Sequence, residues 1–277
     1  MVEGGTSNLP IDLDQLGQHA VPNVADKTLA HAIWASPSSL IFDSQRSGAQ
    51  HLFRMDLDGG HVVRLTSGDT DQLRASVSPD GSKIVYETFT DANGGQDFGL
   101  HVAQADGTKA RPITKGSKSG QTSGDVTASF SPDGKWIAFA HGDDVQAGKA
   151  GIWLVRTDGT ELHRLTDDSL DAAYPRWSPD GKTIVFTQHY DLSTFTPGPL
   201  WIVPAAGGKP TPLTDPADPG WSFEGTFSPD GRQVVFTYFR PGWSHNEIHM
   251  ANSDGANPTT LWISADGYDG NTPDWGP

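Results

Sequence analysis

A four-residue turn motif recurs along the chain and restricts its fold more than any other feature. Ser-Pro-Asp-Gly begins at Ser78, Ser131, Ser178 and Ser228, so the copies lie about 50 residues apart, in the range of known structural repeats. Proline presets φ for a turn, aspartate accepts a hydrogen bond from the backbone two residues on, and glycine supplies positive φ. An apolar run typical of a β-strand follows each copy, at 83–86, 136–139, 183–186 and 233–236.

The remainder of each unit repeats as well. A further strand ends in Asp-Gly or Gly-Gly, and a last one closes on an apolar residue and threonine. This closure occurs at Leu65-Thr66, Ile113-Thr114, Leu165-Thr166 and Leu213-Thr214. A weaker copy of the unit opens at Trp34. Units of this length with several short strands are typical of β-propeller blades, and no segment has the pattern of a long amphipathic helix, so we predict an all-β fold.

The motif and the apolar-apolar-aromatic run after it resemble the WD40-like (PD40) repeat of TolB-like β-propellers, over nearly the whole chain. The resemblance implies one domain, residues 1–277, folded as a six-bladed β-propeller of four-stranded antiparallel blades. Five blades with a loose N-terminal arm is the alternative. The resemblance also implies an extracytoplasmic location, either periplasmic or secreted, although the first ten residues lack the pattern of a signal peptide.

The two ends of the chain favour six blades. Residues 272–275 (Thr-Pro-Asp-Trp) match residues 174–177 (Tyr-Pro-Arg-Trp), so we predict an innermost strand at 271–275. The spacing from Gly17 to Ser36 equals that from Gly159 to Ser178, which predicts outer strands of the same blade within 11–21. A blade shared by both ends would close the ring and remove open sheet edges.

Charge and composition exclude several classes of partner. The chain has 19 basic and 34 acidic residues and a net charge of -15, which disfavours nucleic acid and anionic membranes. It has no cysteine, so disulfides and thiolate metal sites are ruled out. No apolar run is long enough to span a bilayer, so no membrane insertion is expected. We expect a monomer.

Loop lengths differ between the two faces of the predicted ring. The Ser-Pro-Asp-Gly and Asp-Gly turns are short and constant, so the face that they form is predicted to be structural. The opposite face, called the loop face below, carries the variable segments 88–99, 141–151, 188–199 and 238–245. Aromatic residues in such loops are typical of recognition surfaces, and the alternative is that they cap blade edges. The predicted binding residues are Tyr190, Phe195, Trp221, Trp243 and His245.

Alternation along the innermost strands predicts which residues face the central channel. Leu73, Ala75 and Val77 share one side of a strand, so the residues between them should face the axis. The predicted channel residues are His31, Arg74, Tyr174, Arg176, Glu224 and Asp274. They could form a partner or substrate site, or only a solvated tunnel in which arginine pairs with Glu224 or Asp274.

No cofactor is expected, with one alternative. Asp71, Asp125, Asp171 and Asp269 align at the start of their inner strands, and converging carboxylates could bind Ca²⁺. Aspartates in turns also occur for local reasons. The chain has neither a phosphate-binding loop nor a His-Glu-x-x-His zinc motif.

These patterns lead to a functional prediction. We expect a non-catalytic binding or scaffold propeller that recognises a protein, peptide or glycan partner through its loop face and channel mouth. The alternative is a propeller enzyme, a lyase or hydrolase, whose acid and base groups would come from the channel residues. No catalytic residue is assigned.

Overall fold

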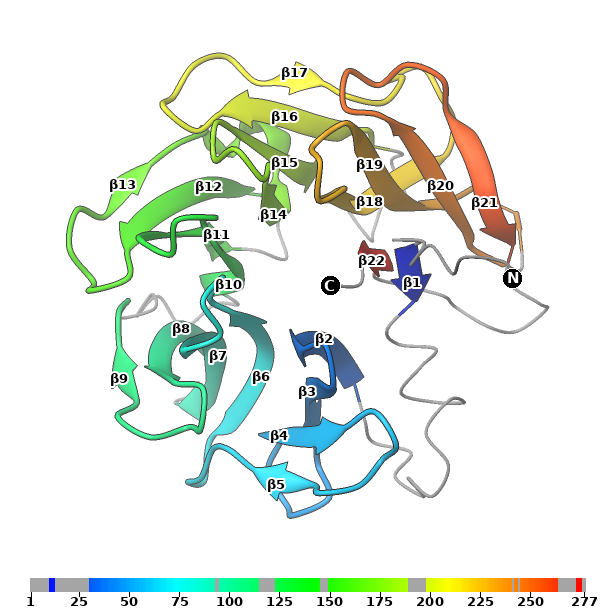
Figure 1. The fold of residues 1–277 in the computed structure, drawn as a ribbon. Coiled ribbons are helices and arrows are strands. Elements are labelled where there is room, and N and C mark those ends of the chain that lie inside the picture. The colour runs from blue at the N-terminus through cyan, green and yellow to red at the C-terminus, as the bar shows by residue number, and fades with distance from the viewer. Residues whose placement is uncertain are drawn as a thin grey trace, which may run out of the picture.

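The computed structural model describes residues 10–12, 30–92, 95–114, 123–144, 149–188, 198–240, 242–243, 245–263 and 273–275. Five blades surround a central axis (Figure 1), and each blade has four antiparallel strands. Blade 1 comprises β2 (Ala30–Ser36), β3 (Ser39–Ser44), β4 (His51–Asp56) and β5 (Val63–Arg64). Blade 2 comprises β6 (Asp71–Val77), β7 (Lys83–Ala92), β8 (Gly95–Gln104) and β9 (Arg111–Pro112).

The other three blades follow in chain order around the ring. Blade 3 comprises β10 (Ser123–Phe130), β11 (Trp136–Asp144), β12 (Lys149–Arg156) and β13 (His163–Arg164). Blade 4 comprises β14 (Ala172–Trp177), β15 (Thr183–Gln188), β16 (Leu200–Pro204) and β17 (Thr211–Pro212). Blade 5 comprises β18 (Trp221–Phe227), β19 (Gln233–Phe239), β20 (Glu247–Asn252) and β21 (Thr259–Ile263). A short parallel pairing of β8 with β10 joins blades 2 and 3 into one sheet.

The prediction of six full blades is wrong in number, and the five-blade alternative matches the structure. In place of a sixth four-stranded blade, β1 (Pro10–Asp12) pairs antiparallel with β22 (Pro273–Trp275), between blades 5 and 1 (Figure 1). The Trp275 indole Nε1 donates to the Thr226 carbonyl at 3.4 Å, which attaches β22 to blade 5. The region before blade 1 has no Ser-Pro-Asp-Gly turn with an apolar run behind it, and that turn begins the second strand of a blade. Residues 13–21, where further outer strands were predicted, lie outside the described residues.

The recurring turn is held by its own side chains. Ser78 Oγ donates to Asp80 Oδ1 at 2.6 Å and accepts from the Lys83 N–H at 2.9 Å. Gly81 donates its N–H to the Ser78 carbonyl at 2.8 Å and has a φ of 68°, which favours glycine. Equivalent bonds occur at Ser131, Ser178 and Ser228. The motif therefore recurs because it fixes the hairpin from the innermost strand to the second strand of a blade.

The threonine that closes a blade has a similar structural role. Thr166 Oγ1 accepts the Ile152 N–H at 2.8 Å and so ties the end of the blade to its third strand. Thr66, Thr114 and Thr214 make the same bond to Leu52, Leu100 and Leu200. Both residues of the bond in blade 3 are buried, so the hydroxyl satisfies a backbone donor that water does not reach.

Each blade packs on its neighbours through its second strand, which is why these strands are apolar without alternation. Val185 and Leu200 of blade 4, for example, lie in one buried cluster with Val234 and Phe236 of blade 5. Among the described residues, no helix is long and apolar enough to cross a membrane.

All five innermost strands are bent at the same place. One residue in each has a φ between 46° and 56°, and the strand pairing shifts register across that residue. Such a bulge re-aims side chains and stores backbone strain. The five residues are His31, Arg74, Thr127, Tyr174 and Glu224.

Candidate functional site

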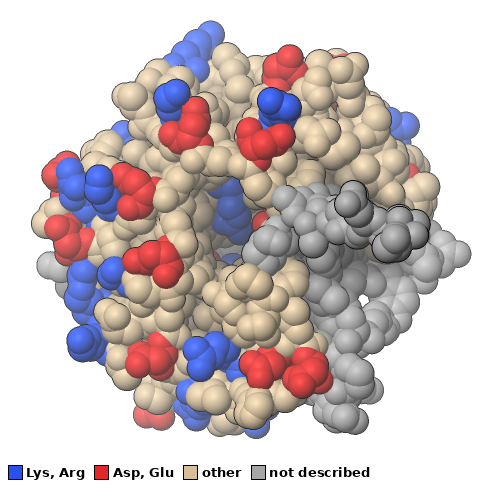
Figure 2. Space-filling model, in the orientation of Figure 1, with Lys and Arg blue, Asp and Glu red and all other residues tan. Residues whose placement is uncertain are grey.

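The bulges direct one side chain from each blade to a single cavity of about 50 Å³. Arg176 also lines it, so five of the six predicted channel residues are brought together. Basic side chains are visible in the central hollow (Figure 2). The sixth, Asp274, lies on β22; burial raises the pKa of its carboxyl, and the charge of Arg176 and the Trp275 N–H oppose this.

Acids of the second strands pair with two of the channel bases, Arg74 and His31. Arg74 Nη1 lies 3.1 Å from Glu87 Oε2, and His31 Nδ1 lies 2.9 Å from Asp43 Oδ1. Glu87 is fully buried; burial raises the pKa of its carboxyl, while the Arg74 charge and the Thr127 N–H act against this. Sequence reasoning missed both acids because it considered only the innermost strands. The sequence signal for both acids was their position directly after the apolar run of the second strand, at 40–42 and 84–86.

The predicted metal residues have structural partners. Asp71 Oδ1 accepts the Gln50 N–H at 2.7 Å, and Asp171 Oδ1 accepts the Ala150 N–H at 3.1 Å; each bond ties one blade to the third-strand region of the blade before it. Asp125 Oδ1 lies 2.6 Å from Nδ1 of His141. In the part of the chain that the structure describes, no three acidic or histidine side chains gather to hold a metal ion. Asp269 lies outside that part, so the calcium site stays a prediction.

A second cavity, of about 340 Å³, extends along blade 5 on its side toward blade 4, and we call it the blade 5 groove. Its aromatic wall is continuous. Trp243 stacks on His245 with ring centroids 5.0 Å apart, and Tyr238 stacks on His249 at 4.5 Å. The Tyr238 and Trp243 rings meet edge to face at 5.9 Å. Two of the residues predicted for the loop face, Trp243 and His245, thus belong to one aromatic array.

The polar groups of the blade 5 groove carry both charges. Tyr238 Oη donates to Asp218 Oδ1 at 2.6 Å, and burial together with this bond raises the pKa of the phenol. The Arg240 guanidinium lies 5.4 Å from the Trp243 ring centroid and donates to Tyr238 Oη at 3.0 Å. Glu247 Oε2 lies 2.7 Å from Nε2 of His249. Burial alone would raise the pKa of Asp218, but its bonds to Tyr238 and to the Gly220 N–H, with the Arg240 charge, lower it.

The remaining loop-face residues are placed differently. Trp221, predicted as an exposed binding residue, is instead 7% exposed and stacks on Phe239 with centroids 5.0 Å apart. It lies at the first position of β18, where the strand is already covered by its neighbours, so it caps a blade rather than forming a surface. Tyr190 and Phe195 lie outside the described residues.

A third cavity, of about 610 Å³, opens between blades 3 and 4. It lies beside the Ser-Pro-Asp-Gly turns at Ser131 and Ser178, on the face that was predicted to be only structural. Two tryptophans, Trp136 and Trp177, line it. Sequence reasoning missed this cavity because it judged the two faces by loop length alone.

Fold and geometry define the chain as a β-propeller of four-stranded blades. No family model matches it. It is 28% identical over 207 residues to an uncharacterized protein of Agrobacterium fabrum, covering 73% of this chain and 66% of that protein. It is 28% identical over 152 residues to a TolB homolog of Chlorobium chlorochromatii, covering 54% of this chain and 31% of the homolog. The chain therefore spans less than two thirds of either relative.

Solved structures agree on the fold. A TolB-assigned protein from Agrobacterium tumefaciens superposes with a TM-score of 0.69 and 23% identity, over 90% of this chain and 86% of that one. TolB from Acinetobacter baumannii superposes with a TM-score of 0.62 and 21% identity, over 92% of this chain and 58% of that one. An oligogalacturonate lyase in complex with manganese superposes with a TM-score of 0.61 and 14% identity, over 83% of this chain and 63% of that one. The chain folds as a β-propeller and is similar in sequence and fold to TolB proteins, as its repeats predicted.

Proposed function

We propose that this propeller is a non-catalytic binding module that holds a segment of a protein partner in the blade 5 groove. One observation carries the proposal. The groove combines a continuous aromatic wall with a volume of about 340 Å³, which falls in the range of roughly 300–1,000 Å³ that ligand sites occupy. Aromatic residues in a partly exposed groove supply much of the binding energy at protein interfaces.

The charges of the groove favour a partner segment with basic residues. Asp215, Asp218 and Glu247 lie along it, and the chain as a whole carries a net charge of -15. Arg240 already rests against the Tyr238 and Trp243 rings, which indicates that a guanidinium fits there. A partner arginine that displaces Arg240 would make the same cation–π contact.

The channel supports a binding role better than an enzymatic one. Its cavity of about 50 Å³ is too small to enclose a substrate. Arg74 and His31, two of the candidate acid–base groups, are engaged by buried acids of the wall. The likeness to a lyase is at 14% identity and concerns the fold. We propose that the channel mouth extends the contact surface and that no reaction occurs in it.

The resemblance to TolB-like propellers is the support for the proposed setting, in which the chain meets its partner outside the cytoplasm. A protein partner is preferred over a glycan because the groove's polar groups, including Tyr238 Oη, Asp218 and the Glu247–His249 pair, are engaged with one another. Few remain to recognise sugar hydroxyls.

Site-specific photo-cross-linking in cells of the source organism tests the proposal. A photoreactive side chain replaces Thr259, an exposed residue on the groove rim, and a control variant carries it at Val62 on blade 1. We expect a discrete protein adduct from position 259, none from 62, and loss of the adduct when Trp243→Ala is added. An adduct that persists with Trp243→Ala, or no adduct at 259, would contradict the proposal.

A further inference from the structure

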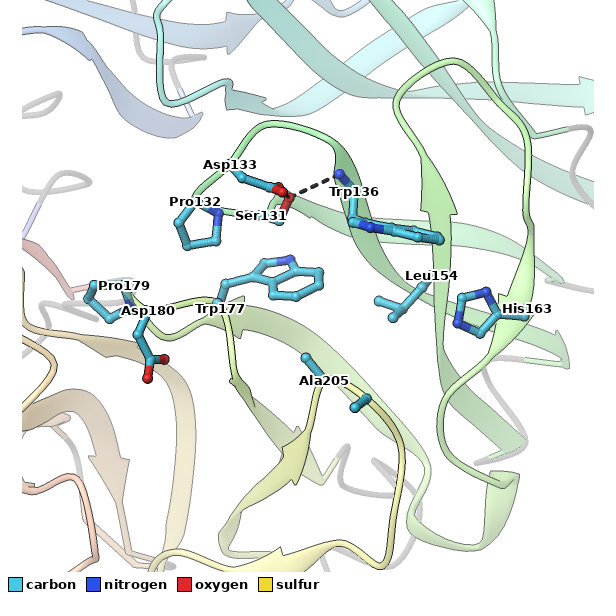
Figure 3. Close-up of a pocket in the computed structure, with 12 residues that line it drawn as sticks. Ser131, Pro132, Asp133, Trp136, Leu154, His163, Trp177, Pro179, Asp180 and Ala205 are labelled. Carbon is cyan, nitrogen blue, oxygen red and sulfur yellow. Dashed lines mark hydrogen bonds between the residues drawn. The ribbon is translucent and has the colours of Figure 1, made fainter.

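The cavity between blades 3 and 4, called the blade 3–4 groove, lies on the face opposite the loop face. Trp136 and Trp177 project into it from neighbouring blades, with Pro132 and Pro179 on one side and Leu154 and Ala205 along the other (Figure 3). The Trp136 ring meets His163 edge to face, with centroids 5.5 Å apart.

The other blades supply an internal comparison for this groove. The fifth residue after the turn serine is Trp136 in blade 3, and its N–H donates to Ser131 Oγ at 2.9 Å. Lys83, Thr183 and Gln233 occupy this position in blades 2, 4 and 5 and make the same backbone bond. The turn is formed equally well by a polar residue, so the tryptophan is not required for the fold of the hairpin.

The wall of the groove that blade 4 forms also carries an apolar residue where the other blades carry a polar one. The hairpin after the third strand carries aspartate in four blades, at Asp58, Asp106, Asp158 and Asp254. Blade 4 has the exposed Ala206 there instead. Trp177 is larger than Val77, Phe130 and Phe227 at its position, which blade 1 also fills with a tryptophan, Trp34. Trp136 and Ala206 thus each make the wall more apolar or more aromatic than in the other blades, and they meet at this one junction between blades.

Hydrogen bonding in the groove limits what could occupy it. Ser131 Oγ is engaged by Asp133 and by the Trp136 N–H, and the Trp177 indole N–H donates to the Ser129 carbonyl at 3.3 Å. The Trp136 indole N–H donates to none of the described residues. The groove thus offers apolar rings, one free indole donor and the carboxylates of Asp133 and Asp180. These suit an apolar ligand whose own backbone stays solvated and needs a single acceptor contact.

We propose that the blade 3–4 groove docks a proline-containing segment of a protein partner, in the polyproline II conformation, with a basic residue beside the prolines. Aromatic-lined grooves bind such segments because the extended helix is already formed and loses little entropy on binding. Prolines pack on Trp136 and Trp177, and a peptide carbonyl accepts the Trp136 indole N–H.

The negative charge of the groove is the reason for expecting a basic residue in the partner segment. Asp133 and Asp180 line the groove, and their pKa values lie below the ordinary range because serine hydroxyls donate to them, so both stay charged. Their own partners are weak: Lys135 and Lys182 lie 3.5 and 3.4 Å away and are largely exposed. An arginine of the partner can replace either lysine.

Selection from a peptide display library on the intact chain tests this inference. Trp136→Thr gives blade 3 the residue that blade 4 carries, so folding is retained, and Gln233→Thr is the control at the same turn position of blade 5. We expect wild type and Gln233→Thr to enrich peptides that combine proline with arginine or lysine. The strongest such peptide should bind Trp136→Thr about tenfold more weakly in fluorescence polarisation. Trp243→Ala should not alter that binding, which separates this site from the blade 5 groove.

A second variant guards against a folding effect. Ala206→Lys adds a positive charge at an exposed site in the wall, and it should weaken the basic peptide more than a peptide whose arginine is replaced by alanine. Enrichment without proline, equal binding by Trp136→Thr, or binding of cellohexaose that depends on Trp136 would overturn the inference.

Discussion

Glu87 of blade 2 accepts the backbone N–H of Thr127 of blade 3 at 2.6 Å. Thr127 is the bulge residue of its strand, so a buried acid of one blade satisfies the strained turn of the next. Asp43 accepts from the Arg74 N–H at 3.2 Å and Thr187 from the Glu224 N–H at 2.9 Å in the same way. These contacts hold the channel-lining bulges in place from blade to blade.

Removing the Glu87 carboxylate should destabilise the ring. Glu87→Ala leaves the Arg74 guanidinium and the Thr127 N–H without an acceptor, and breaking a buried ion pair costs about 3 to 5 kcal/mol. Arg74 keeps 32% of its side chain exposed, so we expect the lower end, about 3 kcal/mol. Glu87→Gln retains an acceptor and should lose less. Urea titration gives the free energy of unfolding; no change in Glu87→Ala would contradict the interpretation.

Two threonines at matching positions should respond differently to valine. Thr187 Oγ1 accepts the Glu224 N–H, whereas the buried Thr237 Oγ1 in blade 5 has no partner among the described residues. Thr187→Val should cost about 1 to 3 kcal/mol, because it leaves a buried donor unsatisfied, and Thr237→Val should be near neutral. Thermal unfolding of the two variants makes the comparison. An equal loss in both would mean that a further donor reaches Thr237.

Stability should fall in acid through the turn aspartates. Ser78 donates to Asp80, and with the Ser82 N–H this holds the pKa of Asp80 well below its ordinary value of 3.8. A carboxylate with a lowered pKa stabilises the folded state above its unfolded pKa, and this contribution is lost as pH falls through the folded value. Asp80→Asn should therefore flatten the loss of stability below about pH 4.

Denaturant titrations of wild type and Asp80→Asn at several acidic pH values measure the difference between their slopes. Glu87 and Asp274, whose pKa values are raised chiefly by burial, act in the opposite sense but are common to both proteins. Identical slopes would show that the serine bond does not persist in solution.

The sequence predicted those parts of the fold that repeat. The Ser-Pro-Asp-Gly and Leu-Thr motifs make hydrogen bonds within a single blade, so each copy of a motif predicts one blade. The blade count was wrong because Thr272 to Trp275 matches an innermost strand, yet a motif match says nothing about whether three more strands exist to pair with it. Alternation placed His31, Arg74, Tyr174, Arg176 and Glu224 around one cavity because the bulge recurs in every blade.

Contacts between blades could not be predicted in this way. Glu87 and Asp43 act on residues of the following blade, at sequence separations that no local pattern encodes. Trp221 and Trp243 are equally aromatic in the sequence, and only packing against Phe239 distinguishes the buried one from the groove residue. The blade 3–4 groove arises from substitutions in two blades, which become visible as a site only when the blades are neighbours.

The blade 5 groove is tested most directly by measuring partner affinity and unfolding free energy on the same two variants, Trp243→Ala and Trp221→Ala, with the protein captured by cross-linking as titrant. We predict that Trp243→Ala weakens binding at least about tenfold and loses less stability than Trp221→Ala, because Trp243 is only half-buried and groove anchors carry binding energy. Trp221→Ala should instead lose about 3 kcal/mol of stability as a buried side chain. Full affinity in a folded Trp243→Ala variant would contradict the central claim.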